Sequence, residues 1–129
     1  MNRQASVCFI QVDDEVLLLK RQEKEGKYTG WCLPGGKQEP GETALQTCIR
    51  ETDEETTIKI YAPDYIGSHV SGSGDFDVSI FFKTLLSKPD VAIRIREHSE
   101  YAWVKISDLD KYELSGNTKK FMDLVFISR

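Results

Sequence analysis

The chain has 129 residues, of which 40% are hydrophobic and 29% are charged, and this size and composition favour one soluble globular domain over residues 1–129. Its net charge of −4 disfavours a nucleic acid as the main partner, because duplex binding needs a basic patch. The cysteines Cys8, Cys32 and Cys48 have no short C-x-x-C spacing, so neither a disulfide framework nor a zinc site is expected. Their apolar neighbours favour buried, reduced thiols and a cytoplasmic protein. No apolar run approaches the ~20 residues of a membrane span, so no membrane partner is expected.

The first half of the chain predicts a strand pair followed by one strong helix. Strands are expected at 5–12 and 15–20, with a turn at residues 13 and 14. Residues 21–30 predict a loop, and the Pro-Gly-Gly at 34–36 predicts a turn after a short apolar step. A helix is expected at 42–56, with an acidic residue, Glu42, near its positive end. Its predicted apolar face consists of Leu45, Cys48, Ile49 and Thr52.

The second half predicts further strands and a closing helix. The expected strands are 58–62, 65–70, 76–86, 91–96 and 100–104, with a hairpin turn or loop at 71–74. The last helix is expected at 118–126, where Asn117 is placed to act as its N-cap. Strands interrupted by one helix and closed by another predict an α/β fold, with a mixed sheet covered on both sides.

Three glutamates on the first helix carry the strongest chemical signal. Glu51, Glu54 and Glu55 stand at i, i+3 and i+4, which puts them on one helix face within reach of a common point. A divalent cation would relieve their mutual repulsion, and oxygen ligands without nearby thiols favour Mg²⁺, or Mn²⁺, over Zn²⁺. Mg²⁺ completes its shell with water and substrate phosphates, so this helix indicates phosphate chemistry.

The alternative interpretation is a solvated helix face with an ion pair to Arg50 or Lys59. The preceding loop weighs against it. Pro-Gly-Gly at 34–36 and Pro-Gly at 40–41 lead directly into the helix, and glycines allow the backbone to approach a ligand closely.

Residues 36–58 resemble the Nudix box, G-x5-E-x7-R-E-U-x-E-E-x-G-U, where U is a bulky aliphatic residue. Every charged position of the pattern is met, by Glu42, Arg50, Glu51, Glu54 and Glu55, between Gly36 and Ile58. Thr52 replaces an aliphatic residue and Thr57 replaces the glycine. The resemblance, closest to MutT-like members, implies a Nudix-type α/β/α sandwich with a mixed β-sheet between helices, and hydrolysis of a phosphoanhydride bond.

The same resemblance implies roles for the box residues. Glu51, Glu54 and Glu55 correspond to the metal ligands of the family, with the carbonyl of Gly35 as an additional ligand. Arg50 and Glu42 are expected to brace the site. The general base is either Glu51 or a glutamate of the late segment at 97–103. There, Glu97 is preferred over Glu100, and His98 is expected to pack or hydrogen-bond rather than act as a base.

The substrate is less well indicated. Arg21 resembles a phosphate-contacting arginine, Lys37 could meet phosphate, and Asn117 resembles a base-recognising asparagine of MutT-type members. Each has a plain alternative as a surface residue or helix cap. Aromatic residues are available to stack on a base, namely Tyr28, Trp31, Phe81, Phe82 and Tyr101.

Three classes of function remain open. A nucleoside triphosphate, canonical or oxidised, is the default substrate, since markers of ADP-ribose and dinucleoside-polyphosphate members are not evident at 72–76. Nucleotide sugars, dinucleotides and a pterin triphosphate are alternatives with the same chemistry. A non-catalytic nucleotide sensor and an acidic protein-interaction domain are the other classes. Either a monomer or a homodimer is compatible with the sequence.

Overall fold

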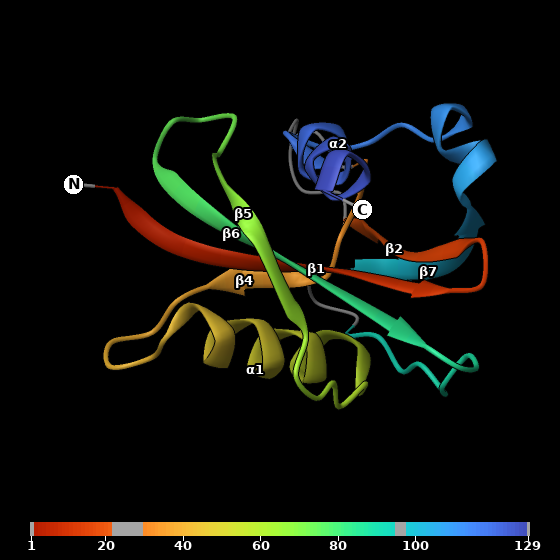
Figure 1. The fold of residues 1–129 in the computed structure, drawn as a ribbon, viewed down its shortest axis with the longest axis horizontal. Coiled ribbons are helices and arrows are strands. Elements are labelled where there is room, and N and C mark those ends of the chain that lie inside the picture. The colour runs from red at the N-terminus through yellow and green to blue at the C-terminus, as the bar shows by residue number, and fades with distance from the viewer. Residues whose placement is uncertain (1, 22–29, 95–97, 129) are drawn as a thin grey trace.

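A computed structural model describes residues 2–21, 30–94 and 98–128. One mixed sheet runs through it in the order β3-β2-β1-β6-β5, with β4 paired to β1 and β7 paired to β2. Only β1 and β6 are parallel, over ten residue pairs, and the other pairings are antiparallel. Helix α1 covers one face and α2 the other (Figure 1), which confirms the expected α/β/α sandwich. The strands are β1 (Arg3–Val12), β2 (Glu15–Arg21), β3 (Trp31–Cys32), β4 (Gly35–Lys37), β5 (Asp64–Val70), β6 (Phe76–Leu85) and β7 (His98–Lys105), and the helices are α1 (Ala44–Thr56), the 3₁₀ helix η1 (Ile106–Lys111) and α2 (Thr118–Ser128).

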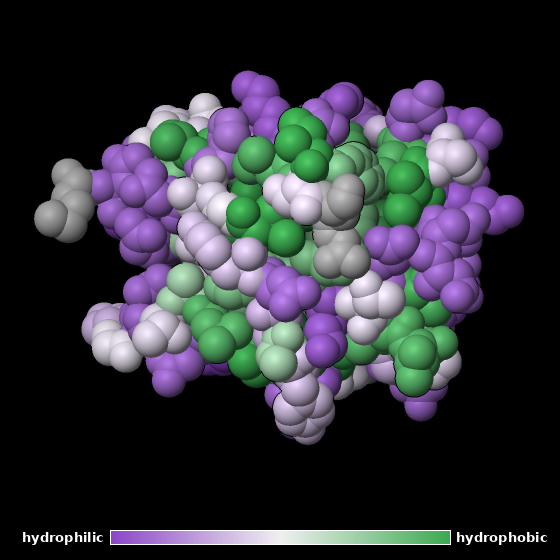
Figure 2. Space-filling model, viewed as in Figure 1, coloured by the Kyte–Doolittle hydropathy of each residue, from purple (hydrophilic) through white to green (hydrophobic). Residues whose placement is uncertain are grey.

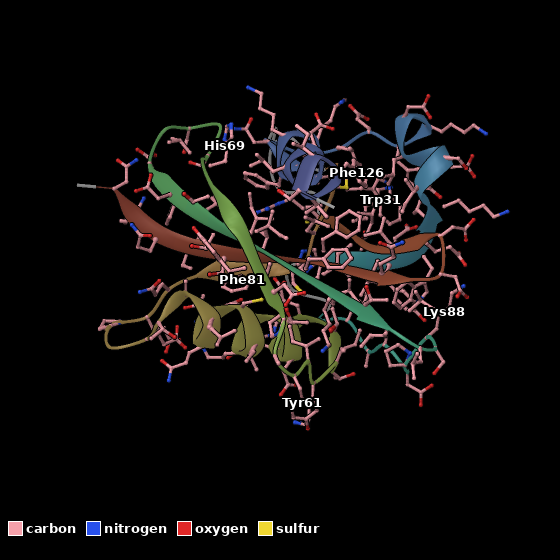
Figure 3. The ribbon with its side chains drawn as sticks, viewed as in Figure 1. Trp31, Tyr61, His69, Phe81, Lys88 and Phe126 are labelled. Carbon is pink, nitrogen blue, oxygen red and sulfur yellow. The ribbon has the colours of Figure 1, made fainter. Side chains whose placement is uncertain are left out.

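The alternation of side chains along β1 divides the core into two layers. Successive side chains of a strand point to opposite faces, so Cys8 and Ile10 pack in the layer that contains residues of α1, whereas Phe9 packs with residues of α2. Phe81 belongs to the α1 layer. Phe126 of α2 packs edge-on against Phe9, with the two ring centres 5.6 Å apart. Figure 3 shows Phe81 and Phe126 on opposite sides of the sheet.

Helix α1 begins two residues later than predicted. Thr43 is its N-cap and forms a capping box with Gln46, an arrangement that satisfies two backbone N–H groups at the helix start. Glu42 therefore precedes the helix rather than opening it. The buried face is also rotated from the prediction, because Leu45 is 41% exposed while Glu55 is buried.

Two predicted strands are wrong, and β4 was missed. Residues 58–62 form no strand, although Ile58 and Ile60 are buried. Residues 91–94 form none either, because the N–H groups of Ala92 and Arg94 donate to the carbonyls of Thr56 and Glu55 at the end of α1. They satisfy helix carbonyls that would otherwise lack partners. Residues 95 and 96 lie outside the described part of the chain.

The surface facing the reader in Figure 2 is a mixture of hydrophilic and hydrophobic residues, with the hydrophobic ones in small groups. Scattered exposed apolar side chains of this kind are normal for a folded domain. Within residues 2–21, 30–94 and 98–128, no helix has the length and apolar character needed to cross a bilayer.

Thr57 occupies the left-handed position that ends α1, with φ +65°. A residue with a Cβ is disfavoured there by about 1–2 kcal/mol, and glycine is not, although glycine costs roughly 0.5–1 kcal/mol in the unfolded chain. Thr57→Gly should therefore raise stability by about 0.5–1 kcal/mol and the melting temperature by roughly 2–4 °C. Thr57→Ala, which keeps the Cβ, is the matched control for thermal unfolding and should not be stabilised. Equal effects of glycine and alanine would contradict the argument.

Candidate active site

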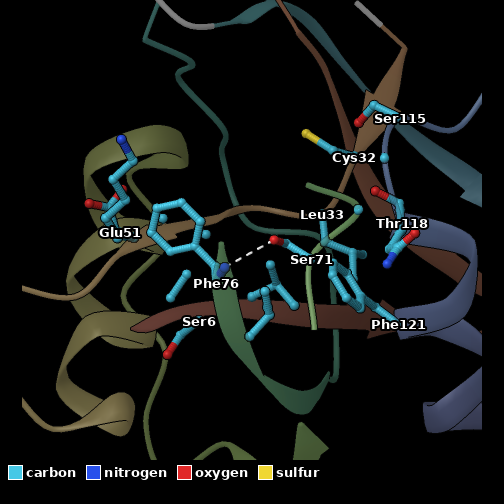
Figure 4. Close-up of a pocket in the computed structure, with 18 of the residues that line it drawn as sticks. Ser6, Cys32, Leu33, Glu51, Ser71, Phe76, Ser115, Thr118 and Phe121 are labelled. Carbon is cyan, nitrogen blue, oxygen red and sulfur yellow. Dashed lines mark hydrogen bonds between the residues drawn. The ribbon is translucent and has the colours of Figure 1, made fainter. Parts of the chain in front are cut away.

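A cleft of about 930 Å³ joins the acidic helix to the opposite face of the sheet. At one end it is lined by Glu51 and Glu55 of α1, and at the other by Thr118 and Phe121 of α2. Figure 4 shows Glu51 and Phe76 at one end, and Ser115, Thr118 and Phe121 at the other. The volume falls in the range of small-molecule sites, about 300–1,000 Å³.

Two glycines of β4 give the carboxylates access to this cleft. A Cβ on Gly36 would lie 2.4 Å from Glu51 Cδ and Oε2. A Cβ on Gly35 would lie 2.1 Å from the carbonyl oxygen of Ser6 on β1. Both distances are far below contact, so β4 packs closely against the acidic helix only because Gly36 has no side chain, and against β1 only because Gly35 has none.

Arg50 ties the loop to the acidic face. Its Nη1 donates to Glu51 Oε1 at 2.7 Å and to Glu54 Oε2 at 3.2 Å, and its Nη2 donates to Glu42 Oε1 and to the Lys37 carbonyl, each at 3.0 Å. The hydrogen bond from Arg50 lowers the pKa of Glu42 from 4.5 to about 2. The same bond is the main cause of a raised pKa for Arg50. Charge-assisted bonds of this type fix both partners.

The three glutamates occupy different surroundings. The side chain of Glu55 is 4% exposed, and its Oε1 accepts from the Gly35 N–H at 2.7 Å. The side chains of Glu51 and Glu54 are 16% and 37% exposed, and Glu54 does not line the cleft. Across the described ranges, no three Asp, Glu, His or Cys side chains converge as a preformed metal cage. The shared helix face is therefore present, but the expected common point is not, because Arg50 and Gly35 hold the carboxylates apart.

The structure brings the predicted substrate residues to the same cleft. Arg21, Lys37 and Asn117 all line it, and Lys37 Nζ lies 5.6 Å from the centre of the Phe76 ring. Asn117 Nδ2 donates to the Val70 carbonyl at 2.9 Å. This bond tethers the start of α2 to the end of β5, while the Asn117 carbonyl accepts from the Phe121 N–H at 3.0 Å, so Asn117 stands directly before the helix, where the cap was expected.

The late segment is brought to the site only in part. Glu97 lies outside the described residues, so its position is not given. Glu100 is exposed on β7 opposite Lys20 and does not line the cleft. His98 is buried, as expected of a packing residue, and lies beside Glu55.

The far end of the cleft was missed by sequence reasoning. Of the aromatic residues expected to stack on a base, Trp31 packs edge-on against Tyr112, and Phe81 and Phe82 are core residues. Tyr101 does not line the cleft, and Tyr28 lies outside the described ranges. The aromatic and polar lining there comes from Phe121, Ser115 and Thr118, and Phe76, Ser71 and Ser73 line other parts of the cleft. Only the serine-glycine turn at 71–74 offered a local signal for any of these.

Comparison with known proteins agrees with this architecture. A family model described as the NUDIX domain matches residues 1–125. Nucleoside triphosphatase NudI of Escherichia coli O81 is 31% identical, over 96% of this chain and 97% of that protein. A MutT NUDIX hydrolase from Burkholderia pseudomallei has the same fold, with a TM-score of 0.82, 22% identity and coverage of 97% and 98% of the two chains. A bifunctional NMN adenylyltransferase/ADP ribose pyrophosphatase from Francisella tularensis, solved with AMP and a manganese ion, matches 98% of this chain over 41% of its own length (TM-score 0.76, 21% identity).

The fold and the cleft thus define a hydrolase of the α/β/α sandwich type. The chain belongs to the NUDIX family, and it is a MutT-like Nudix pyrophosphohydrolase.

Gly36→Ala should separate the fold from the function. The clashing atoms belong to the far end of the Glu51 side chain, which can move aside at little cost to stability. Displacing a catalytic group by about 1 Å lowers the rate by roughly 100-fold, so we expect a loss of that size in hydrolysis with a nearly unchanged melting temperature. Gly67→Ala, at an open position on β5, is the control and should leave activity unchanged. Full activity of Gly36→Ala would contradict this prediction.

The Glu42–Arg50 pair should make stability depend on pH in the acid range. Because the pKa of Glu42 is lowered by folding, from 4.5 to about 2, the pair stabilises the protein fully above pH 4.5. That contribution is lost as the pH falls from 4.5 through 2. Glu42→Gln should therefore melt below wild type at pH 7, and the gap should narrow as the pH falls below 4.5. Glu113→Gln, at an exposed position, serves as the control, and a pH-independent gap for Glu42→Gln would refute the linkage.

Proposed function

We propose that this enzyme hydrolyses a nucleoside triphosphate to a nucleoside monophosphate and pyrophosphate, with Mg²⁺ as the cofactor and Mn²⁺ as a substitute. The observation that carries the proposal is the single cleft that connects two carboxylates, Glu51 and Glu55, to an aromatic and polar end at Phe121 and Ser115. Its volume of about 930 Å³ and its mixed lining suit a substrate that carries both phosphates and a nucleoside. Oxidised triphosphates belong to the same substrate class.

The donor atoms at the acidic end suit a hard divalent cation. Glu51, Glu54 and Glu55 are proposed as ligands, together with the carbonyl of Gly35. Mg²⁺ is usually held by one or two carboxylates and completes its shell with water and phosphate oxygens, so a preformed cage of three side chains is not required. When bound, the cation neutralises the phosphates and lowers the pKa of a bound water.

The residues of the chain position the reaction. Arg50 holds Glu51 and Glu54 in place through its guanidinium fork, and Arg21 and Lys37 are proposed to contact phosphate oxygens. A glutamate accepts the proton of the attacking water, whose oxygen forms the new P–O bond as the bond to the leaving phosphate breaks in line. Most of the rate enhancement comes from positioning and charge stabilisation.

Two glutamates are the candidates for the general base. Glu51 lines the cleft directly. Glu97 is the candidate preferred from the sequence and lies outside the described residues, whereas Glu100 is exposed and does not line the cleft. A base variant loses kcat while cation binding persists, whereas a ligand variant loses both.

Asn117 is the proposed contact to the nucleobase. Because the Val70 carbonyl requires a donor, the NH₂ group of the amide faces Val70 and Oδ1 remains as the acceptor. Oδ1 would lie 3.7 Å from a Cβ on Gly72, another residue of the cleft. Asn117 therefore favours a base that presents an N–H donor.

The cysteines indicate the cellular compartment in which the enzyme works. The three cysteines are free and buried, which supports a reducing compartment such as the cytoplasm. A nucleotide is the proposed partner, and the enzyme works as a monomer or a homodimer of a single Nudix domain.

A substrate panel tests the proposal. With Mg²⁺, wild type should release pyrophosphate from nucleoside triphosphates in preference to nucleotide sugars, dinucleotides or a pterin triphosphate. Glu51→Gln should lose at least about 100-fold in kcat, the scale of a lost catalytic base, while its fold persists. Glu113→Gln is the charge-matched control and should match wild type. Tight nucleotide binding without hydrolysis would favour the non-catalytic sensor, and preferred release from another diphosphate would replace the proposed substrate.

A further inference from the structure

His98 lies at the start of β7, between two residues that line the cleft. Its Nδ1 is 3.9 Å from Glu55 Oε2, and both side chains are about 95% buried, at 5% and 4% exposure. Its Nε2 lies 3.8 Å from Cys32 Sγ. The imidazole therefore bridges a thiol on β3 and a carboxylate on α1.

The thiol beside Nε2 favours a proton on the other ring nitrogen. Burial raises the pKa of Cys32 to about 12, so the group is a neutral S–H at physiological pH. An S–H is a weak donor, and the neutral imidazole has one acceptor and one N–H. When Nε2 accepts from Cys32, the N–H is on Nδ1, the nitrogen that faces Glu55.

The carboxylate of Glu55 has a close neighbour on each side. The Gly35 N–H donates to Oε1 at 2.7 Å, and His98 Nδ1 lies 3.9 Å from Oε2, which is longer than a hydrogen bond. In a buried setting of low dielectric, even this approach is stronger than in water. The two neighbours together restrict the orientations open to the carboxylate.

We propose that His98 is a positioning residue, which holds Glu55 in the orientation that binds the divalent cation and so sets the cation affinity of the site. The inference rests on the proposed role of Glu55 as a ligand. Partners that orient a metal ligand typically change metal affinity by about 10–100-fold when they are removed. A role for His98 as the general base is disfavoured, because both ring nitrogens face protein side chains and the ring is almost fully buried.

Two variants at position 98 separate orientation from packing. His98→Leu keeps an apolar side chain of moderate size but has no N–H. His98→Asn places an amide N–H near the position of Nδ1. We expect His98→Leu to weaken Mn²⁺ binding by at least about 10-fold, measured by electron paramagnetic resonance titration of the nucleotide-free protein. His98→Asn should remain within about 3-fold of wild type, well short of the loss expected when the partner is removed.

A second readout distinguishes positioning from catalysis. The Mg²⁺ concentration for half-maximal hydrolysis should rise in His98→Leu, while kcat at saturating Mg²⁺ stays close to wild type. Tyr61 is 73% exposed and does not line the cleft, so Tyr61→Leu is the matched control and should leave both quantities unchanged.

The remaining outcomes overturn the inference. Wild-type Mn²⁺ affinity in His98→Leu, or equal losses in the leucine and asparagine variants, would show that the N–H toward Glu55 does not set the affinity. If wild type binds the cation and hydrolyses nucleotides in either case, the proposed function survives. If wild type binds no cation at all, the proposed function fails and this inference fails with it.

Discussion

One guanidinium allows an acidic helix face to fold beside a glycine loop. The carboxylates along α1 repel one another, and Arg50 offsets that repulsion through bonds to Glu42, Glu51 and Glu54. A planar fork of five donors can serve several acceptors at once, which lysine cannot. Because Arg50 also binds the Lys37 carbonyl, the loop and the helix are held in one arrangement. The protein can therefore form its site before any cation arrives.

The cleft is lined by residues from both faces of the sheet. Glu51 lies on the α1 side of the sheet, whereas Val7, Phe76 and Val78 lie on the α2 side, yet all four line one cavity. They meet across β4, where Gly36 has no side chain to separate them. A short strand that begins with two glycines is what lets side chains of one layer reach a ligand bound in the other.

The parts of the site that could be predicted are those encoded by local spacing. The glutamates and Arg50 lie within one helix and its preceding loop, so their neighbourhood follows from chain geometry. The rest of the cleft depends on long-range pairing, since Phe76 joins it through the parallel register of β6 with β1 and Phe121 joins it from α2. The strand predictions at 58–62 and 91–94 failed because they too rested on local periodicity alone. Alternating burial reports which side chains face the core, but it does not report whether the backbone bonds to a strand or, as Ala92 does, to a helix end.

The three glutamates of the motif differ in a way that bears on how a cation enters. Arg50 bonds to Glu51 and Glu54, so on the proposed function a cation competes with the guanidinium for both. Arg50 would still keep its hydrogen bonds to Glu42 and to the Lys37 carbonyl. The low pKa of Glu42 ensures that this carboxylate stays charged. Glu55 is instead held by the backbone of Gly35, which a cation need not displace. On the proposed function, Glu55 is therefore the preorganised ligand, whereas Glu51 and Glu54 bind the cation only when it displaces Arg50.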